Sequence, residues 1–558
     1  MFLGRFRYHP AMAKKYDHLS REDLIALHQK RDASRKLGLV WERDEIEHEA
    51  ALNDDFVALD LDESLSVGDG PHRNLIIEGD NFDALRYLNI AYRGRVKCIY
   101  IDPPYNTGNK DFVYNDHYVD KEDRFRHSTW IEFMYRRLVL AKDLLTSDGV
   151  IFVSIDDNEL FNIGMLMNRV FGDSNFIANL IWKRKAGGGD DSDHIATEHE
   201  YIVCFALNKA KTSIARVLHE SPSMTAKYNR SESGRRYYLE RLDKTSLTYS
   251  KSMDFPIRCP DGTYISPHQP DPSNPRTSWR WGKKTVEERA EELTFVKDKK
   301  TKEWHVYTRT WEPLEGVTPR SLLVEKHHGR NRDGTQELTD LIGPRVFNNP
   351  KPTALIGHII NIGAYEADAI VLDFFAGSGT TAHAVLDLNK KDGGQRRFIL
   401  VSCTEATPDL PSKNICRDVC AKRVRRVIEG HSDSKGNPVV GLGGEFAYLR
   451  ATRLPMERLH STIRHDQVWT ALQQLHAGVI TPYSKSDLHV LDITDTDLYY
   501  VSKMSKAVLD TLSVRARKKK PAVVFSWQPG LLTQRIASEH IAFEKIPEFL
   551  VDRFGGQQ

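Results

Sequence analysis

The stretch VLDFFAGSGTT (residues 371–381) consists of an apolar strand, a glycine turn and the first residues of a helix. Gly377 and Gly379 allow other atoms to approach the backbone closely, and a helix that begins here offers unpaired N–H groups. Such a turn suits a nucleotide-like ligand at the carboxyl edge of a parallel sheet, but it also occurs as a plain connection between strand and helix. It is not a P-loop, since the lysine of GxxxxGK[ST] is absent, and Ala382 breaks the full GxGxxG pattern.

Strands and helices alternate on both sides of this turn, which predicts a mostly parallel sheet with helices on both faces, an α/β fold. Two more apolar runs, 177–185 and 200–207, bracket a glycine-rich loop and are expected to form a hairpin-like excursion at the sheet edge. The core strands are expected at residues 74–80, 96–101, 149–155, 369–375 and 396–403.

A second turn, IYIDPPYNTG (99–108), also follows a core strand. Its two prolines fix φ and remove two N–H donors, so backbone carbonyls are left as acceptors beside the Asp102 carboxylate and the Tyr105 ring. One interpretation is a rigid β-turn with an exposed tyrosine. The other is a chemical site, because an acid, a stiff carbonyl and an aromatic ring lie together at the carboxyl end of a strand.

The chemistry that fits this second interpretation is reaction at an exocyclic amine of a base. Such an amine is a poor nucleophile, because its lone pair is drawn into the ring. Asp102 and the Pro103 carbonyl could accept its two hydrogens and return electron density to nitrogen, while Tyr105 stacks on the base. Base–aromatic stacking contributes about 1–3 kcal/mol per base, and the base has to leave its duplex to reach such a pocket.

Length and charge limit the alternatives. The chain has 558 residues, 79 Lys plus Arg and 77 Asp plus Glu, so its net charge of +2 excludes a histone-like protein that binds by bulk charge. Charge is nevertheless segregated: residues 1–70 carry 10 basic and 15 acidic side chains, and residues 211–344 carry 24 and 19. The second segment also holds four of the nine tryptophans, at positions 279, 281, 304 and 311.

The two motifs together resemble the amino-methylating, S-adenosylmethionine-dependent DNA methyltransferases of the β class, in which DPPY (here 102–105) precedes the glycine loop (here FAGSGT, 375–380). The longer strings IDPPYNTGN (101–109) and LDFFAGSGTT (372–381) are similar to those of the modification subunits of type III restriction systems and of related solitary adenine methyltransferases. The resemblance implies a Rossmann-like methyltransferase core with a mostly parallel, seven-stranded type of sheet and a circularly permuted motif order.

The resemblance also implies roles for individual residues. A leading Asp in the motif favours adenine N6 over cytosine N4 as the methyl acceptor, with direct in-line transfer and no covalent enzyme intermediate. The implied catalytic residues are Asp102, Pro103, Pro104 and Tyr105. The implied S-adenosylmethionine-binding residues are Asp80, Asn349, Lys351, Asp373, Phe375, Ala376, Gly377, Gly379, Thr380 and Glu405, and no metal is required.

Three other functions stay open at this point. The chain could methylate cytosine N4, it could be a regulator of the same fold that has lost catalysis, or it could act on RNA or protein. The intact DPPY and FAGSGT motifs oppose the second possibility, and the basic, tryptophan-rich segment favours duplex DNA over RNA.

The resemblance divides the chain into five parts. Residues 1–73 are predicted as an N-terminal helical extension, in which Ser20 caps a charged helix that runs to about residue 50. The parts that follow are the catalytic part of the core (74–210), an inserted target-recognition, DNA-binding domain (211–344), the cofactor part of the core (345–430) and a C-terminal α/β domain (431–558).

The expected partners are double-stranded DNA and a second copy of the chain in a homodimer or higher oligomer. Two alternatives stay open: a type III subunit works with a separate restriction subunit, whereas a solitary enzyme works alone as a homodimer. This chain has no nuclease or helicase motif, so it is not expected to cut DNA by itself. The candidate DNA contacts are Lys183, Arg184, Lys185, Arg235, Arg236, Arg276, Arg280, Lys283 and Lys284.

Six cysteines and the lack of a long apolar run indicate a reducing, non-membrane environment, so a cytoplasmic, nucleoid-associated bacterial enzyme is expected. Cys416 and Cys420 lie four residues apart in a predicted helix (413–428). Two thiolates at this spacing could share a metal, but no second pair of ligands stands nearby, so two packed thiols are the favoured interpretation.

Overall fold

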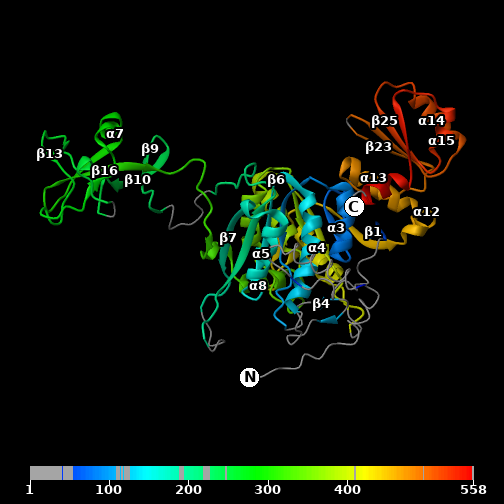
Figure 1. The fold of residues 1–558 in the computed structure, drawn as a ribbon, viewed down its shortest axis with the longest axis horizontal. Coiled ribbons are helices and arrows are strands. Elements are labelled where there is room, and N and C mark those ends of the chain that lie inside the picture. Colours follow the sequence, from blue (N-terminus) through cyan, green and yellow to red (C-terminus); the bar gives the residue numbers. More distant parts are fainter. Residues whose placement is uncertain are drawn as a thin grey trace.

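The computed structural model in Figure 1 shows a central sheet with helices on both faces, a small β-rich region set apart at one end, and a second α/β region at the other. No helix among the residues described below is long and apolar enough to cross a membrane. The structure describes residues 20, 41, 55–108, 113–114, 117–118, 126–187, 194–217, 226–245, 248–406, 410–493 and 495–555.

The central sheet of the described chain contains ten strands. Six neighbouring strands run parallel, and an antiparallel hairpin follows them, as the two apolar runs before residue 210 predicted. The strands are, in order across the sheet, β1 (Phe56–Val67), β22 (Phe446–Leu454), β2 (Leu75–Glu78), β19 (Arg397–Ser402), β18 (Ile370–Asp373), β3 (Val96–Ile101), β6 (Leu145–Ile155), β8 (His199–Ala206), β7 (Phe176–Lys183) and β17 (Leu322–Leu323).

The predicted α/β, Rossmann-like class is confirmed. Seven adjacent strands of the sheet, in the order β2, β19, β18, β3, β6, β8 and β7, form the predicted type of sheet, and β1, β22 and β17 are added to them. One of these, β1, pairs antiparallel with β22. The prediction of a helical extension is therefore wrong for residues 56–67. The second half of β1 carries acidic residues and is partly exposed, and this polar pattern hid the strand. Apart from Ser20 and Trp41, the predicted helix of residues 20–50 lies outside the described residues.

Side chains on alternate positions of β3 point to opposite faces of the sheet, as the period of a strand requires. Ile99 and Ile101 join a core formed with one set of helices, whereas Cys98 and Tyr100 join the core on the other face. The first set comprises α3 (Asn81–Ala91), α4 (Arg126–Leu144) and α5 (Leu160–Phe171). The second comprises α8 (Asn331–Ile342), α9 (Thr353–Gly363), α10 (Thr380–Asp392), the π turn η5 (Cys416–Ala421) and α11 (Lys422–Glu429).

The segment between the two motifs forms a region of its own, visible at the left of Figure 1. A four-stranded antiparallel sheet packs on a small core that includes Leu242, Trp279 and Val306. Its strands are β15 (Leu293–Lys297), β16 (Trp304–Trp311), β10 (Arg235–Arg241) and β9 (Arg230–Glu232), and the helix α7 (Lys283–Glu288) lies beside them.

The C-terminal part contains a unit formed by a four-stranded sheet with helices, and β22 within this part belongs to the central sheet. The helix α13 (His465–Ala477) packs on β1 and α3 and joins the unit to the core. The unit comprises β23 (Leu488–Asp492), β24 (Asp497–Val501), α14 (Lys506–Arg515), β25 (Ala522–Ser526), α15 (Pro529–Arg535), β26 (Ile541–Lys545) and α16 (Glu548–Gly555).

Candidate active site

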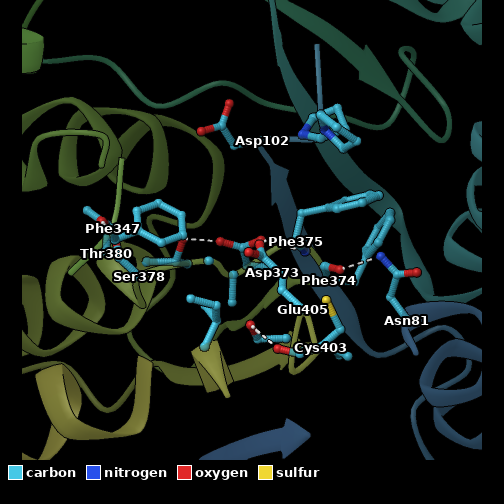
Figure 2. Close-up of a pocket in the computed structure, with 18 of the residues that line it drawn as sticks. Asn81, Asp102, Phe347, Asp373, Phe374, Phe375, Ser378, Thr380, Cys403 and Glu405 are labelled. Carbon is cyan, nitrogen blue, oxygen red and sulfur yellow. Dashed lines mark hydrogen bonds between the residues drawn. The ribbon is translucent and has the colours of Figure 1, made fainter. Parts of the chain in front are cut away.

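A cavity of about 1400 Å³ opens at the carboxyl ends of the parallel strands. Both sequence motifs line it, although they lie on strands far apart in the chain, because β3 and β18 are neighbours in the sheet. Figure 2 shows Asp102 on one side of this cavity and Asp373, Phe375 and Glu405 below it. Brought together here are Asp80, Asp102, Pro103, Pro104, Tyr105, Asn349, Lys351, Asp373, Phe375, Ala376, Gly377, Thr380 and Glu405.

The DPPY turn is fixed by two hydrogen bonds. The Tyr105 hydroxyl donates to Asp102 Oδ1 at 2.9 Å, and the indole Nε1 of Trp130 donates to the Pro104 carbonyl at 2.7 Å. Burial, and then the charge of Asp102, raises the pKa of Tyr105 well above its usual value, so the hydroxyl keeps its proton. The Pro103 carbonyl has no hydrogen-bond donor in the described part of the chain, which leaves it beside Asp102 as an acceptor.

Trp130→Phe tests this anchoring. The change leaves the Pro104 carbonyl without its donor, so we expect a loss of about 1–3 kcal/mol in the free energy of unfolding. A looser turn should also lower kcat by about tenfold, because reacting groups are then held less well. Urea unfolding and steady-state kinetics measure the two effects. Trp527→Phe removes a comparable bond, from the indole to the Tyr500 hydroxyl at 3.1 Å, and should leave kcat unchanged.

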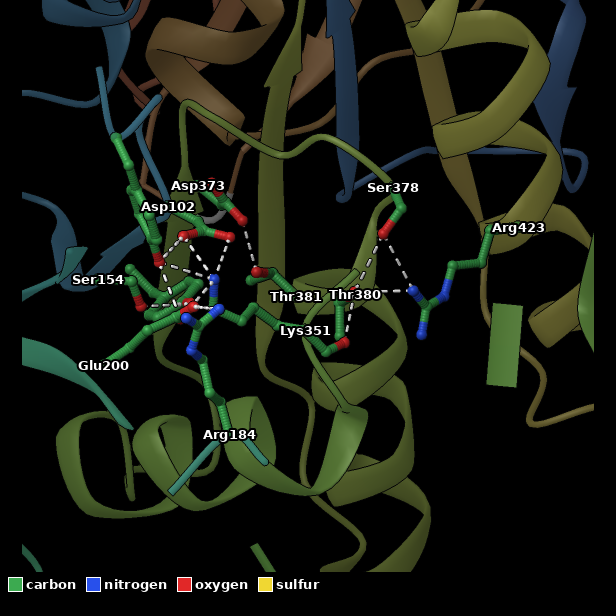
Figure 3. A network of polar contacts seen from close by, with 12 residues as sticks. Asp102, Ser154, Arg184, Glu200, Lys351, Asp373, Ser378, Thr380, Thr381 and Arg423 are labelled. Carbon is green, nitrogen blue, oxygen red and sulfur yellow. Dashed lines mark hydrogen bonds and ion pairs between the residues drawn. The ribbon is translucent and has the colours of Figure 1, made fainter. Parts of the chain in front are cut away.

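The Lys351 side chain points to Asp102 of the DPPY turn. Its Nζ lies 2.8 Å from both carboxylate oxygens of Asp102 and 2.8 Å from the Tyr105 hydroxyl, and Figure 3 shows this cluster. The buried acid Glu200 lies 3.3 Å from the same nitrogen and 3.5 Å from Arg184. Burial opposes the charge of Lys351, but the attraction of Asp102 and Glu200 outweighs it and raises the pKa. The sequence placed Lys351 in the cofactor site, whereas the structure directs its ammonium to Asp102.

The glycine loop has the backbone conformation that its sequence predicts. Gly377 has φ +49° and Gly379 has φ +78°, values that favour glycine. A Cβ atom on Gly377 would lie 2.9 Å from the Phe347 ring, and one on Gly379 would lie 3.1 Å from Cys420 Sγ. Gly379 therefore lets the loop pass close to η5, and α10 begins directly after it at Thr380.

Asp373 ends β18 beneath the loop and is almost fully buried. It accepts hydrogen bonds from the Thr381 hydroxyl at 2.5 Å and from the Phe375 backbone N–H at 3.0 Å. Burial raises its pKa to about 7, although these two bonds oppose the shift. The carboxyl group fixes the start of α10 relative to the strand, which holds the loop in place.

The variant Asp373→Asn should lack the part of the pH dependence of the free energy of unfolding that comes from this carboxyl group. The folded carboxyl keeps its proton up to pH about 7, whereas the unfolded one loses it near 3.8, so wild-type stability from this group falls as pH rises between these values. Relative to the variant, the wild-type free energy of unfolding should fall by about 3 kcal/mol from pH 5 to pH 8. Urea unfolding of both proteins at the two pH values measures the difference, and a constant difference would contradict the assignment.

Two acids mark the opposite side of the cavity. Asp80 caps α3 by accepting from Phe82 N at 2.8 Å and pairs with Arg137 at 3.1 Å. Glu405 follows β19, adopts φ +51° and pairs with Lys413 at 2.8 Å. These acids end neighbouring strands, so a bound ligand would meet both of them.

A buried arginine that the sequence did not reveal joins the parts of this site. Arg423, on α11, is fully buried and donates to Thr380 Oγ1 at 2.7 Å, to Thr353 Oγ1 at 3.1 Å and to Ser378 Oγ at 3.2 Å. Thr380 in turn donates to the Lys351 carbonyl at 3.2 Å. Arg423 thus fixes the positions of the glycine loop, α9 and the Lys351 segment relative to one another. Figure 3 shows Arg423 beside Ser378 and Thr380.

The candidate DNA contacts of the central segment differ in their exposure and in the groups that their side chains contact. Arg236 pairs with Glu312 at 2.6 Å at the surface, and the Arg235 guanidinium lies 5.1 Å from the Trp311 ring centroid. Lys283, Lys284 and Arg276 are exposed. Arg280 instead donates to the Arg241 carbonyl, Glu240 and Thr308, so its side chain stabilises this region.

The three candidates near the hairpin also differ. Lys183 pairs with Glu198 at 2.9 Å, and the side chain of Lys185 is partly exposed. Arg184 lines the cavity, where it lies beside Glu200. The prediction of Arg184 as a DNA contact did not include its proximity to Glu200, which lies beside the DPPY turn.

Cys416 and Cys420 are both buried, and burial raises the pKa of Cys420 to about 12. Their side chains belong to the core under α10 and α11, which agrees with packed thiols. The described residues contain no cluster of three or more His, Cys, Asp or Glu side chains that could hold a metal ion.

The arrangement matches a known family. Residues 96–407, which include both motifs and the segment between them, match the family model described as DNA methylase. This chain belongs to the DNA methylase family. The methylase shares 37% identity over 372 residues with the Mod subunit of the type III restriction-modification enzyme StyLTI of Salmonella typhimurium, covering 60% of this chain and 53% of that protein.

Other relatives of this methylase include the EcoPI Mod subunit of Escherichia phage P1, at 33% identity over 65% of this chain and 64% of that protein. The type II methyltransferase M.KpnI of Klebsiella pneumoniae is 32% identical over 58% of this chain and 79% of its own length. The chain thus spans less than two thirds of the length of either Mod subunit.

Solved structures with some likeness to the methylase include TTHA0409 of Thermus thermophilus complexed with S-adenosyl-L-methionine. It shares 13% identity, with a TM-score of 0.29 and coverage of 63% of this chain and 96% of that one. The cytosine-N4-specific PvuII DNA methyltransferase shares 11% identity, with a TM-score of 0.32 and coverage of 63% and 92%.

Proposed function

We propose that this methylase transfers a methyl group from S-adenosylmethionine to the N6 amine of adenine in duplex DNA. The observation that carries the proposal is the acceptor pair formed by the Asp102 carboxylate and the Pro103 carbonyl. This pair lies at the end of β3, in the same cavity as the glycine loop that follows the neighbouring strand β18.

The residues of the cavity fit S-adenosylmethionine. The positive φ of Gly377 and the Phe347 ring beside it leave a cradle that a side chain on the glycine would fill. Glu405 ends the strand where a ribose diol would be held, and Asp80 would lie near the adenine. When bound, S-adenosylmethionine supplies an electrophilic methyl group, and Asp373 and Phe375 hold the loop against it.

The DPPY turn would activate the acceptor amine. Asp102 and Pro103 O each accept one N–H, which returns the lone pair to nitrogen, while Tyr105 provides a face for the base. The nitrogen lone pair forms the new N–C bond, the electrons of the broken C–S bond remain on sulfur, and the nitrogen then releases one proton. Positioning and polarisation carry the rate, so no nucleophilic cysteine takes part.

A leading Asp, rather than Ser, in the motif supports adenine over cytosine as the target. The runner-up is cytosine N4, because its exocyclic amine presents the same pair of N–H donors to the same two acceptors. A regulator that has lost catalysis is a poorer fit, since Asp102, the Pro103 carbonyl and the glycine loop are all in place.

DNA would lie across the cavity mouth and the region around β10 and β16. Supporting this are the exposed cations of that region and the aromatic surface of Trp311 beside Arg235. We further propose a separate restriction subunit as a partner, because the relatives are named as subunits of type III restriction-modification enzymes. The homodimer or higher oligomer is proposed on the family resemblance of the sequence alone. A cytoplasmic, nucleoid-associated location follows from DNA as the substrate.

Transfer of tritium-labelled methyl groups tests the substrate class. The protein is incubated with labelled S-adenosylmethionine and, in parallel, with amplified genomic DNA that lacks modified bases, total RNA or a mixture of proteins. We expect label in duplex DNA alone. Label in RNA or protein, or no label in any substrate, would refute the proposal.

A further inference from the structure

The catalytic carboxylate already has a cationic occupant. Lys351 Nζ donates to both oxygens of Asp102, each at 2.8 Å, and contacts the Tyr105 hydroxyl at 2.8 Å. A target amine has to donate an N–H to this carboxylate and lie near the same ring. The lysine ammonium therefore takes up a position that the proposed reaction needs for the amine of the base.

The charge of this occupant also opposes the reaction. Methyl transfer moves positive charge from the sulfonium to the amine nitrogen that Asp102 polarises. A lysine ammonium within contact distance of the same carboxylate repels that charge, and repulsion is strong in a buried site. The ammonium therefore has to leave Asp102 before transfer.

An alternative partner lies within reach. Glu200 Oε2 is 3.3 Å from Lys351 Nζ and 3.1 Å from the Tyr105 hydroxyl oxygen, and Glu200 is buried at the start of β8. The Lys351 backbone is meanwhile held, because its carbonyl accepts from Thr380 Oγ1. The side chain can therefore exchange one carboxylate for the other while the segment around it stays fixed.

We propose that Lys351 is a displaceable occupant of the amine-binding position at Asp102, and that Glu200 retains its ammonium when the target base enters. This proposal rests on the proposed methyl transfer and assigns Glu200 as a positioning residue that acts through Lys351. In the absence of the base, Lys351 offsets part of the negative charge of Asp102 and Glu200. In its presence, Glu200 prevents the lysine from competing with the amine.

Glu200→Gln tests the retention step, because the amide no longer attracts the ammonium and Lys351 should stay on Asp102. We expect KM for amplified, unmodified DNA to rise by about tenfold or more, since fewer molecules can accept the base. The dissociation constant of S-adenosylmethionine, measured by calorimetry, should be unchanged. Glu200→Asp keeps the charge and should recover most of the loss.

The double variant Lys351→Met/Glu200→Gln separates this role from a merely structural one. Without the lysine nothing is trapped on Asp102, so the double variant should have a lower KM for DNA than Glu200→Gln alone. A KM for DNA in the double variant that equals or exceeds that of Glu200→Gln overturns the proposal. If the double variant does not fold, as judged by circular dichroism, equal losses in Glu200→Asp and Glu200→Gln overturn it instead.

Glu366→Gln provides the matched control, since Glu366 pairs with the buried Lys97 at 2.8 Å but lies outside the catalytic cavity. Its kinetics should match the wild type. Failure of the proposed function appears as no methyl transfer by the wild-type protein. Failure of this inference alone appears as active wild-type protein, inactive Asp102→Ala and a Glu200→Gln variant with wild-type KM.

Discussion

Asp102→Ala is expected to lower kcat by about 10³-fold, which is the scale observed when one preorganised polar group is lost from an active site. The change removes the acceptor of one amine N–H and leaves only the Pro103 carbonyl to polarise the amine. It also leaves Lys351 with Glu200 and Tyr105 as its contacts. Single-turnover methyl transfer at saturating DNA and S-adenosylmethionine measures the effect.

Asp143→Ala serves as the control for this loss. Asp143 is also a paired carboxylate, with Arg93 at 3.2 Å, but it lies at the surface beyond the cavity. Its kcat should equal the wild-type value. An Asp102→Ala variant that retains kcat within about tenfold of wild type contradicts the assigned role, because loss of a polarising group costs more than that.

Arg423→Met is expected to lower the free energy of unfolding by about 3 kcal/mol or more, the cost of removing one partner from a buried charged network. The hydroxyls of Thr353, Ser378 and Thr380 lose their common donor, and Glu337 loses a cation at 3.5 Å. The glycine loop then loses its tie to α9, so affinity for S-adenosylmethionine should fall as well. Urea unfolding and calorimetry measure the two effects.

Arg417→Met is the control for this variant, because Arg417 lies in the adjoining π turn and pairs with Asp418 at the surface. Its effect on the free energy of unfolding should stay within about 0.5 kcal/mol. If both variants lose the same stability, the network of Arg423 does not hold the loop as described.

The sequence predicted the α/β class and the core strands, because each of these depends on local patterns. Apolar runs mark β3 and β18, and the turns that follow them carry the polar residues of a carboxyl edge. By contrast, β1 was missed, because its second half is acidic and partly exposed. An edge strand that is partly exposed to solvent lacks the continuous apolar run of a central strand.

The sequence could not place the residues that support the site. Lys351 and Asp102 are 249 positions apart, and the direction of a lysine side chain depends on packing, not on a motif. Glu200 gave one signal, an acid at the start of an apolar strand, but its partner was not evident. Trp130 and Arg423 look like ordinary members of amphipathic helices, and only the folded chain shows what they contact.

The most direct test of the central claim is the identity of the methylated nucleoside. DNA that lacks modified bases is incubated with the wild-type protein and S-adenosylmethionine, digested to nucleosides and analysed by mass spectrometry. We expect N6-methyldeoxyadenosine, absent from the parallel reaction with Asp102→Ala. N4-methyldeoxycytidine in its place, or N6-methyldeoxyadenosine formed equally well by Asp102→Ala, would contradict the proposed function.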